Sequence, residues 1–257
     1  MRVTITGAAG RIGRCLTTGL TDAGHDVRGV DLVAPTDAAD GGFVVADIGR
    51  DGAVLDGVVD GADAVVHLAA IASESTFEEA LDTHLRLTHR VLEAAVAAGV
   101  PRVVYASSNH AVGFTPRAAV VGVDTPIRPD SFYGVGKAAA EALCSLYHDR
   151  HGVAVACLRI GSFRPRPDSR RALATWLSPG DAVRLVDACL RAPDLGFAVV
   201  YGISANTRAW WDLTSARALG YEPVDDAESF AADIESVPAT DDDDVDGRFL
   251  GGSFARR

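Results

Sequence analysis

The sequence predicts an α/β protein, built as a doubly wound parallel sheet with a small C-terminal lobe over it. Between residues 2 and 160, short runs rich in valine alternate with segments of helical periodicity. This alternation is typical of parallel sheets, because each crossover between parallel strands needs a connection as long as a helix. A glycine-rich turn follows the first strand. With 257 residues, the chain is long enough for one large domain, or for one domain with a small lobe.

The glycine-rich turn joins a strand over residues 2–6 to an amphipathic helix. Gly7 permits the tight turn, Gly10 lets backbone approach a pyrophosphate, and Gly13 lets the helix pack close to the strand. The start of the helix offers N–H groups and a partial positive charge to phosphates. The turn therefore predicts a Rossmann-like dinucleotide site. Glycines kept for backbone reasons alone are the alternative.

Acidic residues follow the second and third predicted strands. The second strand, residues 26–31, ends at Asp31, eighteen residues after Gly13. Near this spacing a carboxylate meets the adenosine ribose hydroxyls and repels a 2′-phosphate, so the sequence predicts NAD rather than NADP. The third strand covers residues 43–48, and its Asp47 either lies beside the adenine or caps the next helix.

The fourth strand, residues 63–70, is a nearly continuous apolar run, as expected for a strand buried on both faces. It ends in small residues at the carboxyl edge of the sheet, where ligands bind in such folds. We expect His67, inside the run, to be a packed core histidine. A helix over residues 78–98 follows.

The fifth strand, residues 102–110, runs into polar side chains at the same edge of the sheet. These are Ser107, Ser108, Asn109 and His110. Four consecutive polar residues are costly to bury unless they have partners. We therefore expect a substrate or a cofactor beside them, with an ordinary turn as the alternative.

After a sixth strand over residues 153–160, the strand–helix alternation stops. The remaining chain is expected to hold a loop with four arginines at 164–171, a helix at 181–190, a strand at 198–201, a helix at 214–219 and an acidic loop at 239–244. We interpret residues 1–162 as the dinucleotide-binding domain and residues 163–257 as a small lobe packed on it. The two form one compact unit, in which a strand or helix of the lobe can return to the main sheet.

Lys137 is the only lysine among the 24 lysine and arginine residues. A compact ammonium is needed where a point charge must lie next to a titrating group, a task for which the planar guanidinium has the wrong shape. Tyr133 precedes it by four residues, so the two side chains share one face of a helix. A nearby cation lowers the pKa of a tyrosine, which predicts a general base. A chance pair of surface residues is the alternative.

Composition excludes several classes of partner. A net charge of −11 argues against nucleic acid and anionic membranes, since both need a basic face. No apolar run approaches the ~20 residues of a membrane helix, and the N-terminus leads directly into a strand, so we expect a cytoplasmic protein. The four cysteines, Cys15, Cys144, Cys157 and Cys189, form no C-x-x-C motif. We expect them to be buried and reduced, with no metal site.

With these motifs the chain resembles the extended short-chain dehydrogenase/reductase superfamily, also called the NAD-dependent epimerase/dehydratase family. Within it, the chain is most similar to the uronate dehydrogenases. The stretches that carry this second resemblance lie at 106–110, 133–137, 159–162, 190–193, 201–206, 210–212 and 248–254. They cover nearly the whole chain, including the substrate-capping C-terminal lobe.

The resemblance implies NAD-dependent oxidation of a cyclic hexuronate, galacturonate or glucuronate, at C1 to the aldarolactone. Tyr133 would remove the anomeric hydroxyl proton, Lys137 would lower the pKa of Tyr133 and hold the nicotinamide ribose, and Ser108 would hydrogen-bond the same oxygen. The residues implied to hold the sugar are Ser73, Ser108, Asn109, His110, Tyr133, Ser162 and Arg171, the last as a clamp on the C6 carboxylate. The residues implied to bind NAD are Gly7, Gly10, Arg11, Ile12, Gly13, Asp31, Leu32, Asp47, Ile48, Leu68, Ala69, Ala70, Tyr133, Lys137 and Ile160.

Two positions depart from the pattern of these relatives. Ala72 stands where the relatives have a serine that touches substrate, with Ser73 beside it. His84 stands where the superfamily usually has an asparagine tied to a proton-relay water. The alternatives are an aldose 1-dehydrogenase for a neutral or phosphorylated sugar, a nucleotide-sugar epimerase or dehydratase, and a non-catalytic NAD sensor. The superfamily often dimerises through its long helices, so a homo-oligomer is expected.

Overall fold

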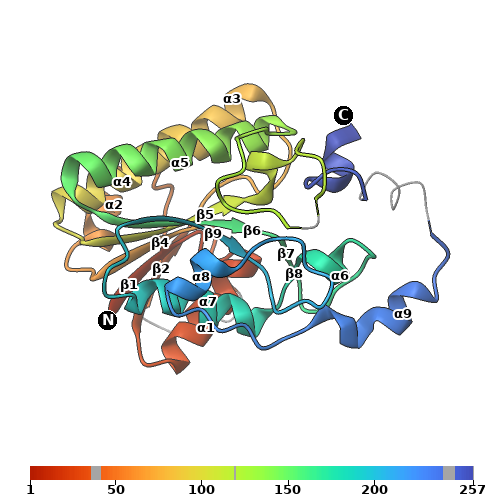
Figure 1. Ribbon diagram of the computed structural model, residues 1–257. Coiled ribbons are helices and arrows are strands. Elements are labelled where there is room, and N and C mark those ends of the chain that lie inside the picture. The colour runs from red at the N-terminus through yellow and green to blue at the C-terminus, as the bar shows by residue number, and fades with distance from the viewer. Residues whose placement is uncertain (36–41, 119, 240–246, 257) are drawn as a thin grey trace.

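The central sheet has seven parallel strands in the order β3-β2-β1-β4-β5-β6-β9 (Figure 1). The computed structural model describes residues 1–35, 42–118, 120–239 and 247–256. The strands of the sheet are β1 (Arg2–Thr6), β2 (Asp26–Asp31), β3 (Phe43–Val45), β4 (Ala64–His67), β5 (Arg102–Ser108), β6 (Ala154–Ile160) and β9 (Phe197–Gly202). The predicted Rossmann-like fold is confirmed.

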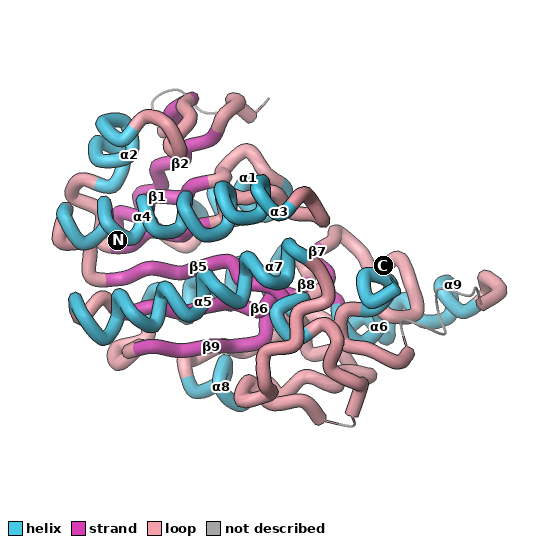
Figure 2. Tube along the Cα trace, turned by 90° about the horizontal axis from the view of Figure 1, so that it is seen from above, coloured by secondary structure: helices cyan, strands magenta, loops and turns pink. Residues whose placement is uncertain are grey.

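Helices cover both faces of the sheet (Figures 1 and 2). On one face lie α2 (Gly52–Val59), α3 (Phe77–Ala80), α4 (Leu87–Ala97) and α5 (Phe132–His151), and on the other lie α1 (Arg11–Asp22) and α7 (Pro179–Arg191). Each layer closes its own apolar core against the sheet. Strands buried on both faces explain the unbroken apolar run of β4, whose four residues are all buried.

Helix α3 continues into α4 through a π-helical segment, Leu81–Arg86. The helix expected at 78–98 is therefore a single rod with one wide turn inside it. A π-helical turn changes which side chains face the sheet, and such turns are frequent at functional sites. Here the wide turn carries His84 inward, where it is fully buried.

The first strands match their predicted ranges, and three others are shorter than predicted. Strand β3 ends at Val45, β4 at His67 and β5 at Ser108, so backbone pairing includes Ser107 and Ser108 but stops before the last residues predicted for each strand. Those residues form the connecting loops. The strand expected at 198–201 is β9, which pairs with β6 as the last strand of the main sheet.

The rest of the C-terminal region packs beside the carboxyl edge of the sheet (Figure 1). It contains the two-stranded ribbon β7 (Ser162–Phe163) and β8 (Trp176–Leu177), with α6 (Ala172–Thr175) and α9 (Ala231–Glu235). A small cluster of Leu173, Trp176, Ala227 and Ala231 is its own core. Helix α8 (Thr214–Ala218) instead packs against β9. The acidic run expected at 239–244 falls mostly outside the described residues.

The last described segment returns across the molecule and pairs with residues 113–117. Phe249 forms an antiparallel bridge with Pro116, Leu250 N–H donates to Thr115 O (3.0 Å), and Gly251 N–H donates to Gly113 O (2.9 Å). Leu250 is fully buried. This C-terminal segment, residues 248–254, therefore forms part of the carboxyl edge of the sheet. Within the described ranges, no helix has the length and apolar character needed to cross a membrane.

Gly13 sets how closely α1 approaches the glycine-rich turn. A Cβ on this residue would lie 2.2 Å from Gly7 O. We expect Gly13→Ala to lower the free energy of unfolding by roughly 1–3 kcal/mol and to weaken NAD binding, since the turn must open to relieve the overlap. Gly57→Ala is the control, because that glycine is exposed on α2 with no neighbour within 4 Å. It should change stability by less than about 1 kcal/mol in urea unfolding. An equal effect of both substitutions would contradict close packing at Gly13.

Candidate active site

The glycine-rich turn lies where β1 meets α1 and presents an uncapped helix start. Gly7 has a φ of 74°, in the left-handed region that favours glycine. Gly10 is the N-cap of α1, and no side chain caps this helix. The first N–H groups of α1, at Arg11, Ile12 and Gly13, are therefore left for an external acceptor. A pyrophosphate fits this position.

Asp31 closes β2 directly beside that turn. Its carboxylate accepts hydrogen bonds from Ala9 N–H (2.9 Å) and Leu32 N–H (2.7 Å). The acid is thus fixed at the place where a ribose bound to the turn would present its hydroxyls. Asp47 does not cap α2: the cap is Asp51, which accepts from Val54 N–H (3.1 Å), while Asp47 accepts from Gly49 N–H (3.0 Å). The helix-cap alternative for Asp47 is therefore wrong, because α2 starts one turn later.

Ser108, Tyr133 and Lys137 converge where the end of β5 meets the first turns of α5. Ser108 acts on the phenol of Tyr133 closely enough to lower its pKa. Lys137 Nζ lies 5.6 Å from the centre of the Tyr133 ring and donates to Ala106 O (2.6 Å). The i, i+4 spacing on α5 thus places phenol and ammonium in one site, as the sequence predicts. The surface-pair alternative is excluded for Lys137, which is 4% exposed.

The pKa of Tyr133 is raised, not lowered as the sequence predicts. Burial raises the pKa most, the hydrogen bond with Ser108 lowers it, and the charge of Asp130 raises it. Burial also lowers the pKa of Lys137 to about 7, while the nearby carboxylate of Glu141 raises it. The prediction failed because it counted the attraction of the cation and not the desolvation of both groups.

A buried carboxylate on the same helix lies one turn beyond Lys137. Glu141 accepts from Ser107 Oγ and forms a two-pronged pair with Arg159, at 3.0 Å from Nε and 2.8 Å from Nη2. Both members of the ion pair have side chains only 5% exposed. Arg159 comes from β6 and Ser107 from β5, so these contacts tie α5 to two strands of the sheet. The charge of Glu141 also favours the protonated form of Lys137.

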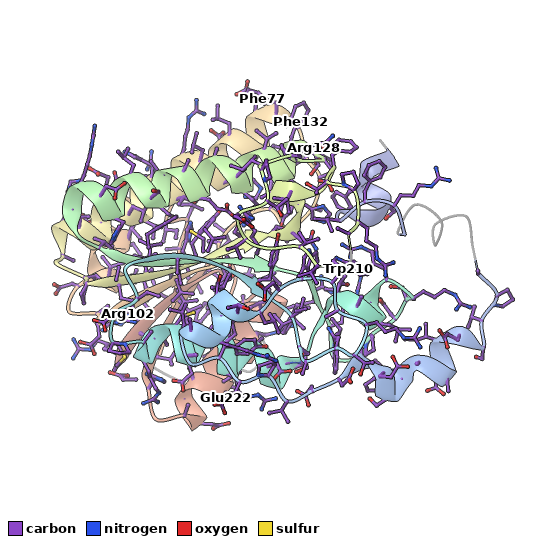
Figure 3. The ribbon with its side chains drawn as sticks, viewed as in Figure 1. Phe77, Arg102, Arg128, Phe132, Trp210 and Glu222 are labelled. Atoms are coloured by element: carbon purple, nitrogen blue, oxygen red, sulfur yellow. The ribbon has the colours of Figure 1, made fainter. Side chains whose placement is uncertain are left out.

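The loop after β4 is tied to the start of α5. The carboxylate of Glu74 accepts the N–H groups of Phe132 and Tyr133, both at 3.2 Å. Next to it, the rings of Phe77 and Phe132 meet edge to face at 5.7 Å (Figure 3). A carboxylate at a helix N-terminus interacts favourably with the helix dipole. Glu74 therefore connects the loop that carries Ala72 and Ser73 to the backbone of Tyr133.

His84 packs against Tyr133 with its ring edge to face, at 5.2 Å between ring centres. Burial and Lys137 lower the pKa of His84 to about 3, so the ring is neutral. Neither ring nitrogen has a hydrogen-bond partner among the described residues. A Cβ on Gly136 would lie 2.8 Å from this histidine. A histidine therefore fits at position 84 only because position 136 is a glycine. His67, by contrast, is the packed core residue that the sequence predicts, bonded to Thr6 and Thr88.

The polar residues after β5 extend the site toward the C-terminal region. Asn109 is 2% exposed, and its Oδ1 has no donor in the described part of the chain. The ring of His110 lies 5.6 Å from that of Tyr133, and its Nδ1 is 2.8 Å from Asp130 Oδ2. An unpaired buried acceptor is costly, and a ligand hydroxyl would satisfy it. The ordinary-turn alternative does not account for this burial.

Ser162 and Arg171 form the far side of the site. Ser162 Oγ lies 2.8 Å from Thr175 Oγ1, and Arg171 Nη1 lies 3.4 Å from Ser162 Oγ. Arg171 Nη2 donates to the carbonyl of Leu250 (2.5 Å) in the C-terminal segment. Arg171 is thus a partly buried arginine held at the sheet edge.

Among the residues predicted to hold the sugar, His110 lies against Tyr133, and Arg171 lies against Ser162. Ser73 is exposed, as is Ala72. The sequence did not single out Glu74, Asp130, Glu141 or Thr175. Only Glu141 carried a readable signal, its i, i+4 spacing from Lys137.

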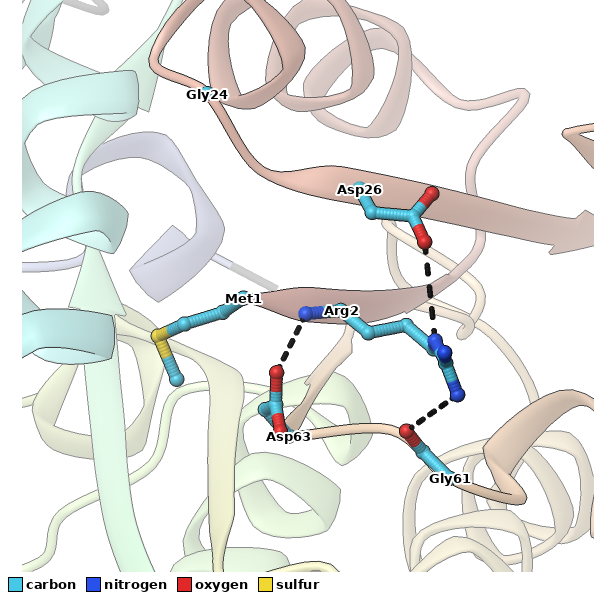
Figure 4. Close-up of a pocket in the computed structure, with 6 residues that line it drawn as sticks. All are labelled: Met1, Arg2, Gly24, Asp26, Gly61 and Asp63. Atoms are coloured by element: carbon cyan, nitrogen blue, oxygen red, sulfur yellow. Dashed lines mark hydrogen bonds and ion pairs between the residues drawn. The ribbon is translucent and has the colours of Figure 1, made fainter.

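A shallow hollow lies at the opposite, amino end of the strands, away from Tyr133 and Lys137 (Figure 4). It is lined by Met1, Arg2, Gly24, Asp26, Gly61 and Asp63. Its Arg2 is already bonded to Asp63 and Gly61. The cysteines are free; three are buried and Cys15 is partly buried. Over the described ranges, no cluster of three His, Cys, Asp or Glu side chains could hold a metal ion.

The chain is similar to known proteins over most of its length. The NAD-dependent epimerase/dehydratase family matches residues 3–179. A uronate dehydrogenase of Agrobacterium fabrum is 41% identical over 98% of the chain and 96% of its own length. The crystal structure of a variant of the Agrobacterium tumefaciens uronate dehydrogenase, complexed with NAD, superimposes with a TM-score of 0.92 at 40% identity, over 100% of this chain and 97% of that one. An NAD-dependent glucose-6-phosphate dehydrogenase of Haloferax volcanii is 36% identical over 91% of this chain and 97% of its length.

The Glu141–Arg159 pair gives a stability prediction. Glu141→Gln should lower the free energy of unfolding by roughly 3–5 kcal/mol, because it leaves the buried guanidinium without its counter-charge. Asp82→Asn is the control: it breaks the Arg86–Asp82 pair, whose side chains are 60% and 59% exposed, and should cost less than about 0.5 kcal/mol. Urea unfolding measures both values. Equal, small effects on the free energy of unfolding would show that Arg159 does not need Glu141 as its counter-charge.

Proposed function

The chain belongs to the NAD-dependent epimerase/dehydratase family, and we propose that it oxidises a cyclic hexuronate, galacturonate or glucuronate, at C1 to the aldarolactone with NAD. Similarity to uronate dehydrogenases over the full length of the chain supports this activity. So does the chemistry of the site, which combines a base, a hydroxyl donor and an arginine around one polar edge of the sheet.

The observation that carries the proposal is a continuous series of contacts from Tyr133 to Arg171. Tyr133 lies against His110, and His110 lies against Phe254, at 4.3 Å between ring centres. The C-terminal segment that carries Phe254 also accepts the hydrogen bond from Arg171 at Leu250. These contacts support one site with the base toward one end and the cation toward the other. A sugar with a reacting carbon at one end and a carboxylate at the other suits this arrangement.

Tyr133 would take the proton of the anomeric hydroxyl, and Ser108 would donate a hydrogen bond to the same oxygen. When bound, NAD supplies the acceptor for the hydride that leaves C1. A cationic Lys137 favours the phenolate of Tyr133 and opposes the effect of burial on its pKa. Hydride can leave carbon only as the oxygen loses its proton, so base and donor must meet at one oxygen.

The remaining polar groups would hold the sugar. Arg171 would pair with the C6 carboxylate, because a guanidinium binds a carboxylate through two parallel hydrogen bonds. Ser162, Asn109 and His110 would bind ring hydroxyls. Ser73 would take the contact that Ala72 lacks, which requires the exposed loop after β4 to close over the sugar.

The glycine-rich turn and Asp31 would bind the pyrophosphate and the adenosine ribose of NAD. Asp47 and Ile48 would lie beside the adenine, with Leu32 next to the ribose. Leu68, Ala69, Ala70 and Ile160 would contact the nicotinamide half, together with Tyr133 and Lys137. The acid at position 31 supports NAD over NADP, because it repels a 2′-phosphate.

Three broader features belong to the same proposal. Residues 1–162 would bind NAD, and residues 163–257 would bind the substrate. Exposed Phe77, Phe132, Val135 and Leu146 on the α3 and α5 layer support a homo-oligomer. Free cysteines support a cytoplasmic location, where thiols stay reduced.

A second candidate is an aldose 1-dehydrogenase for a phosphorylated sugar. Ala72 favours it, because one sugar contact is missing, and Arg171 would then bind a phosphate. A nucleotide-sugar enzyme needs a larger lobe to hold its nucleotide, and a non-catalytic NAD sensor would not need the Tyr133 and Lys137 pair. Neither fits this site as well.

The substrate is tested by NADH formation with galacturonate, glucuronate, galactose and glucose 6-phosphate, each tried with NAD and with NADP. We expect turnover with uronates and NAD. Arg171→Ala should raise KM for uronates roughly 10- to 100-fold and leave neutral sugars little changed, since a charged hydrogen bond contributes about 1.5–3 kcal/mol. Arg166→Ala, in the same loop but 60% exposed, is the control. Turnover of glucose 6-phosphate alone would favour the second candidate. Equal losses on all sugars would rule out a carboxylate clamp.

Tyr133→Phe should lower kcat by at least ~10²-fold, because it removes the general base while leaving the ring packing intact. NAD affinity, measured by fluorescence titration, should stay within about twofold. Tyr147→Phe makes the same change on the same helix, at a phenol that bonds Glu93 instead. It should keep its activity. Normal turnover by the Tyr133 variant would assign the base to another residue.

A further inference from the structure

Asp130 is a fully buried carboxylate that the proposed chemistry does not use. Its side chain is 0% exposed. Oδ2 lies 2.8 Å from His110 Nδ1, and Oδ1 accepts from Ser131 Oγ (2.8 Å). An ionised carboxylate is costly to bury, so a chain that keeps one must hold it with specific partners. Here the two partners are His110, which follows β5, and Ser131, which caps α5.

Two glycines from distant segments make room for this carboxylate. A Cβ on Gly113 would lie 1.9 Å from Asp130 Oδ2, and a Cβ on Gly251 would lie 1.6 Å from the same atom. Gly251 belongs to the C-terminal segment, which pairs with residues 113–117. The acid is therefore enclosed where that segment closes on the core, and no larger residue fits at either glycine.

The first partner, His110, lies between the base and the C-terminal segment. Its ring is 5.6 Å from that of Tyr133 and 4.3 Å from that of Phe254. With a carboxylate on Nδ1, the proton of the neutral ring sits on Nδ1, and Nε2 is left as an acceptor. Asp130 thus selects the tautomer that His110 presents.

The second partner, Ser131, is the N-cap of α5. Its hydroxyl donates to Asp130 and accepts from Gly134 N–H (3.0 Å). Because the hydroxyl donates its hydrogen bond to the carboxylate, its lone pairs remain free to accept from the helix N–H group. Tyr133 lies in the first turn of that helix, so the same acid orients the residue that caps it.

We propose that Asp130 is a positioning residue of the active site, which holds His110 with Nε2 as the nitrogen that accepts a hydrogen bond from a sugar hydroxyl and fixes the cap of the helix that carries Tyr133. The proposal rests on the proposed function for the identity of the sugar. The orientation of the ring does not depend on that identity.

Removing the charge of Asp130 should also change the pH dependence of the base. The titratable and charged groups around Tyr133 are Lys137 on its own helix, His84 on the π-helical segment, His110 after β5, Glu74 at the helix start, and Asp130. The charge of Asp130 raises the pKa of Tyr133, so its removal lowers that pKa. The base is active when deprotonated, so the acidic limb of the kcat profile moves to lower pH.

The first test is Asp130→Asn, assayed with the uronate that the wild-type enzyme turns over. We expect KM for the sugar to rise roughly tenfold, NAD affinity to stay unchanged, and the acidic limb to shift down by at least about half a pH unit. Asp181→Asn removes another fully buried carboxylate, which lies in the first turn of α7 and accepts from Val224 and Asp225 N–H. This control should lose stability without any shift in the pH profile. A similar profile change in both variants would mean that the effect of Asp130 is merely structural.

A double-mutant cycle with His110→Gln tests whether Asp130 acts through His110. The two KM effects should be strongly non-additive, because either substitution destroys the same orientation. The pH shift of Asp130→Asn should persist in the His110→Gln background, since it comes from the charge. Additive KM effects would overturn the proposal.

A spectroscopic measurement covers the case in which Asp130→Asn does not fold. In wild-type protein, the ¹⁵N signals of the His110 ring should show the neutral tautomer with its proton on Nδ1. The proton on Nε2 would overturn the proposal. If the wild-type enzyme turns over no sugar, the proposed function fails, and the tautomer still decides the role of Asp130.

Discussion

Burial of a single ammonium group is the constraint around which the active site is arranged. Lys137 is almost without solvent, so its charge depends on the Ala106 carbonyl and on Glu141 one helical turn away. Glu141 is in turn neutralised by Arg159 from the neighbouring strand. The ammonium is compact and its pKa responds to its surroundings, whereas a guanidinium stays charged. The contacts of Lys137 and Glu141 tie α5 to β5 and β6.

The fold was predictable because it depends on local patterns. The strand–helix alternation, the glycines after β1 and the acid at the end of β2 each encode backbone geometry within a few residues. The i, i+4 spacing of Tyr133 and Lys137 likewise needs no distant partner. The strand ends were overestimated, because polar residues after β5 leave the ladder to line the site.

The rest of the site depends on partners that are far apart in the sequence. Glu74 and the start of α5 are separated in the sequence by β5, and Asp130 sits between Gly113 and Gly251, two glycines that are far apart in the sequence. Neither Glu74 nor Asp130 belongs to a sequence motif, so their place in the site could not be predicted from spacing. The direction of the Tyr133 pKa also could not be read from sequence, because it depends on how much water the fold removes.

The C-terminal segment gives the two halves of the site different thermodynamic character. The dinucleotide half is bounded by adjoining strands of one sheet. The half proposed to bind sugar is closed by the contacts of Leu250 with Thr115 and Arg171, which close very long loops. Such closure costs chain entropy and adds few backbone hydrogen bonds, so this edge has the lower local opening free energy. In the proposed function, sugar would enter and product would leave through local opening at this edge, while the sheet stays folded.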